Sequence, residues 1–433
     1  METTSTRCAN TDHLVIIGNG MAGHRLVEVL LKQPRRPSRI TVIGAEPIPA
    51  YNRILLSPLL AAELDEDALT LHDADWYRRH GVELILGEQV ERLDRTQRRL
   101  TTHSGRILDY DRLVLATGSR PAMPPVPGIE LEGVQGFRDM QDTARLTAAA
   151  ERGGRAIVVG GGLLGLEAAE GLRKQGHGKH GMAVTVLQRG ERLMNRQLDA
   201  TSAELLRSEL TKRGLEVLTG ARLAAIENNG QGKVAGVALE DGRRLPADCV
   251  VVAAGITPNA ELGRSAGLTV ELGINVDDTL TTSDPYVHAL GECCEFQGTT
   301  YGLVEPIWRQ AEVLAARLSG TKASAYFDLP SATKLKVSGI SLYAFGPTEA
   351  TDDHEVLSYH DPEQGDYRRL LLQEGRIVGA VLYGDTACGP WYFEQSLAGT
   401  NLNACRQALL FGQADSQALL DSQTSSDYSK EVA

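Results

Sequence analysis

The sequence predicts an α/β protein with two Rossmann-like domains and a small α+β domain at its C-terminal end. LVIIGNGMAGHRLVEVLL (14–31) and AIVVGGGLLGLEAAEGLRKQG (156–176) each have the pattern of a buried strand, a glycine-rich turn and a helix. A second strand follows each of them, ITVIGAE (40–46) and AVTVLQR (183–189). Two such βαβ units in one chain indicate two separate domains, each with a parallel sheet.

The C-terminal domain is predicted from a run of short strands near the end of the chain. These strands are VLSYH (356–360), YRRLLLQ (367–373) and IVGAVLYG (377–384), and EGR joins the last two as in a hairpin. We expect a domain over 326–413 that holds these strands and a closing helix. The polar residues 414–433 have the composition of a flexible tail.

The composition limits the class of protein. With 433 residues the chain is long enough for two or three domains with full cores. Its net charge of −12 argues against a nucleic-acid partner, which would need a basic face. No run approaches the roughly 18 apolar residues of a membrane-spanning helix, so we expect no membrane association. Six cysteines without paired spacing fit a reducing cytoplasm.

The first glycine turn has the G-x-G-x-x-G spacing of a dinucleotide-binding loop. Gly18 would make the tight turn, Gly20 would let the backbone approach a pyrophosphate, and Gly23 would let the helix pack closely on the strand. The N-terminus of the following helix would receive the negative charge. Glu46 ends the next strand, where a carboxylate accepts hydrogen bonds from ribose hydroxyls.

The second turn repeats the spacing with Gly160, Gly162 and Gly165, but its next strand ends in Gln188 and Arg189. A carboxylate at this strand end favours NADH, whereas an arginine can pair with the 2′-phosphate of NADPH. Gln188 removes the carboxylate, while Arg189 is either a phosphate ligand or a solvated loop residue. The sequence therefore predicts a nicotinamide cofactor, NAD(P)H, and leaves the choice between NADH and NADPH open.

Two dinucleotide loops in one chain indicate a flavin reductase, with FAD in one domain and NAD(P)H in the other. The alternative is a duplicated fold that binds one dinucleotide only. Residues 47–60, between the first βαβ unit and the rest of the domain, contain no cysteine, so this segment offers no thiol pair for disulfide chemistry. We therefore expect the cofactors to carry out the redox chemistry, while the protein binds, orients and electrostatically tunes them.

Three further motifs follow in order along the chain: LVLATGSRP (113–121), VVVAAGITPN (250–259) and TTSDPYVHALGEC (281–293). They resemble the crossing out of the FAD domain, the return crossing and the second FAD motif of the FAD-dependent pyridine nucleotide-disulfide oxidoreductase superfamily. The resemblance implies a discontinuous FAD domain and an inserted NAD(P)H domain, over 11–122 with 247–325 and over 123–246 respectively.

Within this superfamily the chain most resembles the flavin module of assimilatory NAD(P)H nitrite reductase large subunits and of assimilatory nitrate reductase electron-transfer subunits. Four segments carry the likeness: EPIPAYNRILLSPLL (46–60), LMNRQLD (193–199), YGLVEPIWRQAEVLA (301–315) and ATKLKVSGISLYAFG (332–346). Full nitrite reductases continue with iron–sulfur and sirohaem domains, for which this chain has no four-cysteine signature. We therefore expect a reductase module that passes electrons to another protein.

The fingerprints and the resemblance together give the candidate site residues. Those expected at FAD are Gly18, Gly20, Met21, Ala22, Gly23, Glu46, Arg53, Ala116, Thr117, Gly118, Gly291, Glu292, Leu303 and Val304. Those expected at NAD(P)H are Gly160, Gly162, Leu163, Leu164, Gly165, Glu167, Gln188, Arg189, Ala254 and Gly255. Arg53 and Glu167 are the catalytic candidates. Their alternative roles are a structural ion pair for Arg53 and a helix-surface position for Glu167.

The adjacent thiols in GECCEF (291–296) invite a redox interpretation. Neighbouring Cα atoms lie about 3.8 Å apart across a trans peptide, whereas ordinary disulfides span roughly 4.4–6.8 Å. A bond between Cys293 and Cys294 would therefore be strained, and we expect both thiols to be inert beside the functional Glu292. His177 and His180 fit an exposed polar loop better than a metal site, so no metal is expected.

The sequence thus predicts a cytoplasmic, FAD-dependent NAD(P)H reductase acting in nitrate or nitrite assimilation. Its partner would be an assimilatory nitrate or nitrite reductase catalytic component. The first alternative is a rubredoxin or ferredoxin reductase, although these tend to carry a lysine where Pro58 follows Ser57. The second is a flavin-binding sensor or scaffold without turnover. The C-terminal module would either dock the partner or form a homodimer.

Overall fold

The computed structural model describes residues 12–176, 181–322, 324–337 and 339–419. The chain forms two compact units, and each is continuous in space but not in sequence. Unit 1 comprises Met1–Leu59, Leu64–Ala122 and Gly255–Leu329, and unit 2 comprises Leu60–Glu63, Met123–Ala254 and Pro330–Ala433. Unit 2 therefore includes both the second predicted domain and the C-terminal one.

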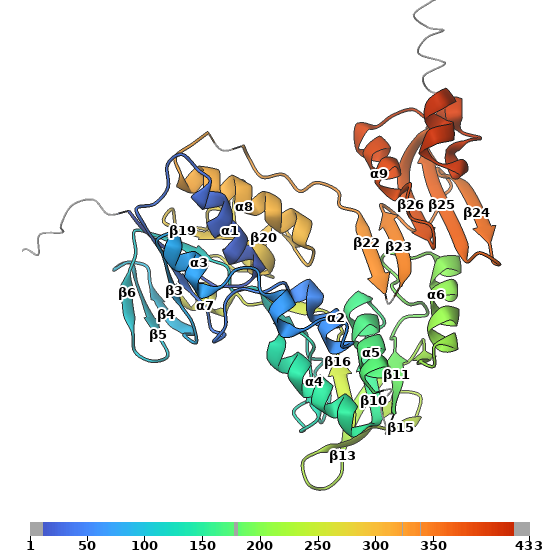
Figure 1. The fold of residues 1–433 in the computed structure, drawn as a ribbon, viewed down its shortest axis with the longest axis horizontal. Helices are drawn as coiled ribbons and strands as arrows, with labels where there is room; N and C mark the ends of the chain where they lie inside the picture. The colour runs from blue at the N-terminus through green and yellow to red at the C-terminus, as the bar shows by residue number, and fades with distance from the viewer. Residues whose placement is uncertain (1–11, 177–180, 323, 338, 420–433) are drawn as a thin grey trace, which may run out of the picture. The chain divides into compact units, whose positions relative to one another are not determined.

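Unit 1 is built on a five-stranded parallel sheet with the strand order β19-β7-β1-β2-β3. All residues of the central strand β1 are buried, as expected for a strand covered on both faces. Helices α1 and α8 pack against each other in this unit (Figure 1). The bounds are β1 His13–Ile17, α1 Met21–Leu31, β2 Arg39–Ile43, α3 Ala74–Arg79, β3 Val82–Ile85, β7 Arg112–Leu115, β19 Val287–Ala289 and α8 Val304–Leu318.

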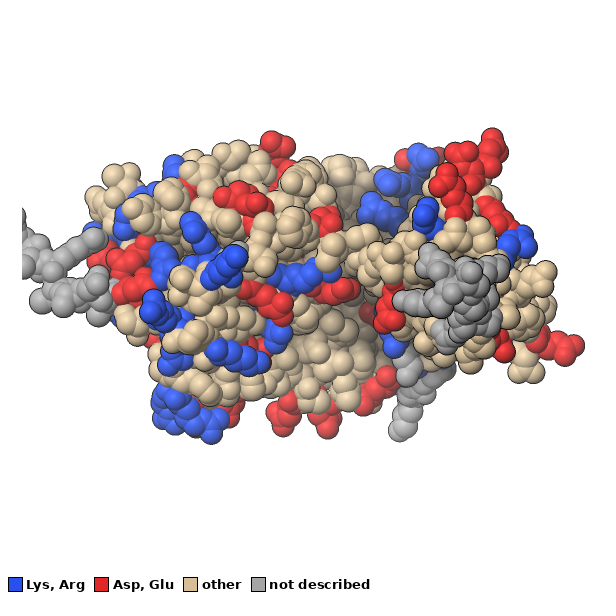
Figure 2. Space-filling model, turned by 90° about the horizontal axis from the view of Figure 1, so that it is seen from above, with Lys and Arg blue, Asp and Glu red and all other residues tan. Residues whose placement is uncertain are grey.

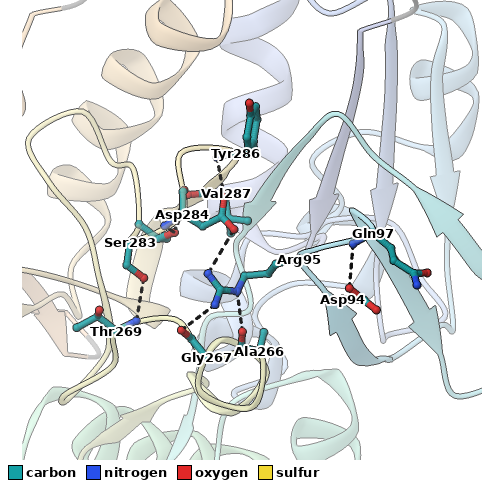
Figure 3. A network of polar contacts seen from close by, with 11 residues as sticks. Asp94, Arg95, Gln97, Ala266, Gly267, Thr269, Ser283, Asp284, Tyr286 and Val287 are labelled. Atoms are coloured by element: carbon teal, nitrogen blue, oxygen red, sulfur yellow. Dashed lines mark hydrogen bonds and ion pairs between the residues drawn. The ribbon is translucent and has the colours of Figure 1, made fainter. Parts of the chain in front are cut away.

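A side-chain clamp ties an antiparallel sheet of unit 1 to the segment that leads into β19 (Figure 3). Arg95 donates hydrogen bonds to the carbonyl oxygens of Ala266 (2.6 Å) and Gly267 (3.1 Å) and pairs with Asp284 at 3.3 Å. These contacts span more than 170 residues of sequence. The sheet contains β4 Val90–Asp94, β5 Arg99–Thr102 and β6 Ile107–Asp109, and the clamped helix is α7 Glu261–Ser265.

Unit 2 contains a second parallel sheet, with the strand order β12-β11-β10-β16-β9. β16 pairs with β10 in this sheet, so the return to unit 1 occurs at Gly255 and not at residue 247 as we expected. The bounds are β9 Val134–Gln135, α4 Met140–Arg152, β10 Gly154–Val159, α5 Leu163–Gln175, β11 Met182–Leu187, α6 Ala200–Lys212, β12 Glu216–Leu218, β13 Leu223–Asn228, β14 Val234–Leu239, β15 Arg244–Pro246 and β16 Cys249–Val252.

The C-terminal part of unit 2 is a five-stranded antiparallel sheet with the order β22-β23-β26-β25-β24. It contains the predicted hairpin, and its core includes Trp391 and Tyr392 of α9. The bounds are β22 Thr333–Val337, β23 Ile340–Phe345, β24 Glu355–Asp361, β25 Asp366–Gln373, β26 Arg376–Tyr383 and α9 Gly389–Ala398. Residues 413–419 form a helical segment, although we expected 414–419 to belong to a flexible tail. Residues 420–433 lie outside the described part of the chain.

Short elements complete the described chain: η1 Arg53–Leu55, α2 Leu56–Leu60, η2 Glu66–Leu69, β8 Ser119–Pro121, β17 Ile256–Pro258, β18 Ile274–Asn275, η3 Gly291–Cys293, β20 Cys294–Phe296, β21 Thr299–Thr300, η4 Asn403–Cys405 and η5 Leu409–Phe411. On the face seen in Figure 2, acidic and basic side chains are interspersed. Among the described residues, no helix combines the length and the apolar character that crossing a bilayer requires.

Candidate functional site

The loop between β1 and α1 holds three glycines with different surroundings. Gly18 has a φ of +118°, and a Cβ on it would clash with the carbonyl oxygen of Ala116. A Cβ on Gly23 would clash with the carbonyl oxygen of Gly18, so α1 packs directly against the loop. A Cβ on Gly20 would meet no heavy atom of the described residues within 4 Å. Open space therefore lies at the position from which a phosphate would approach the backbone.

The loop between β10 and α5 in unit 2 has the same arrangement. Gly160 has a φ of +125°, and a Cβ on it would clash with the carbonyl oxygen of Ala253. A Cβ on Gly165 would clash with the carbonyl oxygen of Gly160, while one on Gly162 would meet nothing within 4 Å in the described structure. Both loops therefore fit a dinucleotide pyrophosphate.

The helices α1, α5 and α8, which begin at candidate cofactor residues, have no capping side chain. The N-cap residues are Gly20 for α1, Gly162 for α5 and Leu303 for α8, and none of these side chains makes a capping hydrogen bond. The first-turn N–H groups and the positive end of each helix dipole can therefore act on an anionic ligand. The candidate residues Met21, Ala22, Leu163, Leu164 and Val304 lie in these first turns.

Glu46, beyond the end of β2, is engaged by two neighbouring side chains. Tyr51 donates a hydrogen bond from its hydroxyl to Glu46 at 2.8 Å, and Arg53 forms an ion pair with the other carboxylate oxygen. The Arg53 guanidinium carbon lies 4.9 Å from the centre of the Tyr51 ring. Arg53, a candidate for catalysis, thus lies at the strand end that we expected to receive the ribose.

The two crossings between the predicted domains are joined inside unit 1. β8 and β17 pair antiparallel. Asn259 donates from its side chain to the carbonyl of Thr117 (2.9 Å) and from its backbone to the carbonyl of Gly118 (2.9 Å). Thr117 returns a hydrogen bond from its hydroxyl to the carbonyl of Asn259 at 2.7 Å. These bonds fix the candidate segment 116–118, and sequence reasoning did not single out Asn259.

Gly291 and Glu292 follow β19, and Gly291 lies against the start of α1. Gly291 has a φ of +85°, and a Cβ on it would lie 3.0 Å from Cβ of Ala22 at the start of α1. Its N–H donates to the side-chain oxygen of Gln310 at 2.8 Å. Ser119 donates to Glu292 at 2.9 Å. Sequence reasoning also missed the fully buried Gln310; its signal is one polar residue within the apolar face of α8.

Cys293 and Cys294 are free thiols with no exposed surface. The sulfur of Cys293 lies 3.4 Å from the carbonyl oxygens of both Leu115 and Leu290, which share its single S–H as acceptors, and Cys294 donates to the carbonyl of Gly291 at 3.2 Å. Burial raises the pKa of both thiols, most strongly that of Cys294. Both are therefore protonated near neutral pH and lack the thiolate that redox chemistry requires.

The strand end of the second loop carries an amide in place of a carboxylate. Gln188 accepts a hydrogen bond from the N–H of Gly161 at 3.0 Å and donates to the carbonyl of Arg192 at 2.9 Å. Arg189 is exposed and Glu167 is partly buried on α5. The remaining candidates, Ala254 and Gly255, are exposed just after β16. His177 and His180 lie outside the described residues.

The segment 193–199 supports the second loop and joins it to the C-terminal sheet. The N–H of Met194 donates to the carbonyl of Gly161 at 2.9 Å. Asp199 caps α6 and is buried. It accepts a hydrogen bond from the hydroxyl of Tyr367 at 2.6 Å and pairs with Arg369 at 3.2 Å. The latter two residues are more than 160 positions away in sequence, so no local pattern indicates this contact.

Comparison with known proteins agrees with the predicted resemblance. The model of the pyridine nucleotide-disulphide oxidoreductase family matches residues 12–313, and that of the rubredoxin NAD+ reductase C-terminal domain matches residues 330–394. A solved covalent putidaredoxin reductase–putidaredoxin complex has a TM-score of 0.82 and 26% identity, covering 96% of this chain and 99% of that chain.

Two curated relatives come from Bacillus subtilis. A nitrite reductase (NAD(P)H) is 42% identical over 376 residues, which are 87% of this chain and 46% of the relative. An assimilatory nitrate reductase electron transfer subunit is 40% identical over 373 residues, 86% of this chain and 48% of the relative. The chain spans about half the length of these relatives. The protein belongs to the pyridine nucleotide-disulphide oxidoreductase family, whose members are NAD(P)H-dependent flavoproteins that typically hold FAD.

Proposed function

We propose that this chain is an FAD-dependent NAD(P)H reductase that passes electrons to a separate redox protein. The acceptor that we favour is the catalytic component of a nitrite or nitrate reductase. The names of the two Bacillus subtilis relatives, a nitrite reductase and a nitrate reductase electron transfer subunit, support this acceptor. The C-terminal sheet would be the part of the chain that meets the acceptor.

The observation that carries the proposal is the presence of two open glycine loops in one chain. A side chain on Gly20 or on Gly162 would meet no described atom, so each loop has room for a pyrophosphate. FAD, when bound, would supply the redox chemistry that connects NAD(P)H to the acceptor. The first loop would hold FAD and the second NAD(P)H.

The residues of the chain would hold and orient these groups. The backbone N–H groups at the start of α1 and α5 would bind the two pyrophosphates. Glu46, held in place by Tyr51 and Arg53, would accept hydrogen bonds from the adenosine ribose. The uncapped start of α8 at Leu303 and Val304 would stabilise negative charge on the flavin ring through its dipole. Glu167 would contact the nicotinamide side of the second site.

The side chain of Gln188 bears on the choice between NADH and NADPH. Its oxygen accepts from Gly161 and its nitrogen donates to Arg192. This position therefore carries a neutral amide in place of the carboxylate that would repel a 2′-phosphate. The exposed Arg189 would be the positive partner of such a phosphate. We therefore propose that the enzyme uses NADPH as well as NADH.

Anaerobic mixing of the FAD-loaded protein with NADH and with NADPH tests the reductase function. Rapid bleaching of the flavin absorbance by either donor is the expected result. Failure with both donors, while dithionite still bleaches the flavin, would favour a sensor or scaffold without turnover. Turnover is then measured with a purified nitrite or nitrate reductase catalytic component as acceptor.

A rubredoxin or ferredoxin reductase is the second candidate function. The match of residues 330–394 to the rubredoxin NAD+ reductase C-terminal domain favours it, as does the fold likeness to putidaredoxin reductase. Reduction rates with rubredoxin, a [2Fe–2S] ferredoxin and the nitrite or nitrate reductase component separate the two candidates. Faster reduction of the small iron proteins would overturn the assimilatory assignment.

A further inference from the structure

Two histidines and a glutamate meet in unit 1, outside the loops described above. His24 and Glu28 lie one turn apart on α1, and His72 lies between η2 and α3. One ligand atom from each residue falls within 4.8 Å of the other two. Oε1 of Glu28 is 3.3 Å from Nε2 of His72 and 3.8 Å from Nε2 of His24. We call these three residues the His24 cluster.

The buried histidine presents a lone pair to the centre of the cluster. His24 is 2% exposed, and its Nδ1 lies 2.6 Å from the hydroxyl oxygen of Tyr77. Tyr77 donates its own hydrogen to Asn19 at 3.0 Å, so its oxygen accepts from Nδ1–H of His24. This tautomer leaves Nε2 as an acceptor, and no hydrogen-bond partner for Nε2 exists among the described residues. A cation between Nε2 and the Glu28 carboxylate would satisfy both groups.

The other two members are positioned by neighbouring side chains. Their inner atoms, Oε1 of Glu28 and Nε2 of His72, are hydrogen-bonded to each other at 3.3 Å, and a bound ion would replace this bond. Arg25 donates to Oε2 of Glu28 at 3.2 Å, so Oε1 faces the cluster. The ring of His72 stacks on Trp76, with centroids 4.2 Å apart and planes 3° apart. The side chain of His72 is 36% exposed, which gives an ion a path from solvent. Such outer contacts orient metal ligands in known sites.

We propose that the His24 cluster binds a zinc ion through Nε2 of His24, Oε1 of Glu28 and Nε2 of His72. Tetrahedral zinc with bonds of about 2.1 Å holds its ligand atoms roughly 3.4 Å apart. The two separations at Glu28, 3.3 and 3.8 Å, are close to this value. Two imidazoles select zinc and similar transition ions over calcium and magnesium, which prefer oxygen ligands. Water would take the fourth position on the exposed side.

The ion would fasten α1 to the segment that precedes α3. Asn19 lies between Gly18 and Gly20 of the first loop and is reached from His24 through Tyr77. The sequence did not indicate this site, because His72 is 44 residues from Glu28 and neither belongs to a ligand motif. The proposed ion would stabilise the first glycine loop through Tyr77 and Asn19. This stabilisation would add to that from a bound cofactor.

Calorimetric titration of the chelator-treated full chain with zinc chloride tests the proposal. We expect one ion per chain, and we expect Glu28→Gln and His72→Ala each to weaken binding at least about tenfold. His80→Ala is the matched control, because this histidine bonds the carbonyl of Trp76 and lies outside the cluster. A double variant of His177 and His180 to alanine controls for the loop histidines. Both controls should bind zinc like the unaltered chain.

X-ray absorption at the zinc edge keeps the proposal testable if a variant does not fold. The expected first shell of the unaltered chain contains two imidazole nitrogens, a carboxylate oxygen and a water. Zinc should also raise the thermal midpoint of the unaltered chain but not that of Glu28→Gln. Absence of zinc binding, a sulfur-containing shell, or binding that survives Glu28→Gln and His72→Ala would overturn the proposal.

Discussion

The two glycine loops have nearly the same backbone and differ in the side chain that stands beside them. φ is +118° at Gly18 and +125° at Gly160, and in both loops the middle glycine faces open space. At the first loop a carboxylate, Glu46, is held by an arginine. At the second, the amide of Gln188 bonds to the loop itself. On the proposed function, the glycines would let a pyrophosphate approach, and the strand-end side chain would select the dinucleotide.

Replacing the third glycine of either loop should have the largest effect. A Cβ in Gly23→Ala or Gly165→Ala would clash with the carbonyl oxygen of the first glycine of its own loop, and neither helix nor strand can move without disrupting the core. We expect Gly23→Ala to purify without FAD. We expect Gly165→Ala to keep FAD but to lose at least about 100-fold in the rate of reduction by NAD(P)H, roughly 3 kcal/mol or more.

Alanine at the middle glycines provides the matched comparison. Gly20→Ala and Gly162→Ala meet no described atom, so thermal unfolding should change little while dinucleotide affinity falls. Flavin absorbance per chain, anaerobic reduction rates and thermal midpoints measure the four variants. Equal behaviour of Gly23→Ala and Gly20→Ala in unfolding would contradict the assigned roles.

The sequence predicts this local geometry well and long-range contacts poorly. Each glycine loop is one contiguous segment in which sterics require glycine at fixed spacing, so the pattern is visible in the chain. The pairing of Asp199 with Tyr367 and of Glu28 with His72 joins segments that no periodicity relates. Arg53 shows the same limit: the sequence left it as either a catalytic residue or a member of a structural ion pair, and its partner Glu46 is known only from the structure.

Acid should weaken the first sheet more than the second, because the first contains two buried histidines, His288 in β19 and His13 in β1, and burial lowers the pKa of both. Burial lowers the pKa of His288 to about 4, with Arg112 and Arg317 adding to the effect and Asp277 opposing it. The strands of the second sheet, VQ, GRAIVV, MAVTVL, EVL and CVVV, contain no histidine. The unfolded chain takes up a proton near pH 6.5, so the free energy of unfolding falls as pH drops from 6.5 to 4, by up to about 3 kcal/mol.

Amide hydrogen exchange in β7 and β19 at several pH values measures this difference. His288→Gln removes one of the two buried histidines and also removes its contact with Thr281 (3.2 Å), while His13 stays in place. This variant should show a shallower loss of protection between pH 6.5 and 4 than the unaltered chain. If protection falls equally steeply with pH in the unaltered chain and in His288→Gln, titration of His288 does not cause the acid sensitivity.

Exchanging the charge state of the two strand ends should have an intermediate effect. Glu46→Gln loses the ion pair with Arg53, and we expect FAD affinity to fall about tenfold. Gln188→Glu still accepts from Gly161 but places negative charge where a 2′-phosphate would lie. We expect the NADH to NADPH ratio of kcat/KM to rise about tenfold.

Arg189→Ala tests whether the arginine at this strand end also contributes to the choice between NADH and NADPH. If Arg189 pairs with the 2′-phosphate, its loss lowers kcat/KM for NADPH and leaves that for NADH unaltered. Steady-state kinetics with both donors measure the effect. A similar loss with both donors would assign Arg189 to general binding or folding, and an unchanged ratio in Gln188→Glu would remove the strand end from coenzyme selection.

The smallest effect is expected at the adjacent thiols, although they lie beside the segment expected to contact FAD. Cys293 and Cys294 are fully buried, and their sulfur atoms donate to backbone carbonyls. Replacing both with alanine leaves small cavities and should lower the free energy of unfolding by roughly 1–3 kcal/mol. The rate of flavin reduction by NAD(P)H should stay within about twofold of that of the unaltered chain, because inert, protonated thiols supply no electrons.

Stopped-flow measurement of flavin reduction in the double variant tests this prediction. A collapse of turnover with FAD still bound would give the thiols a redox role. Retained turnover would leave Gly291 and Glu292 as the functional part of this strand end.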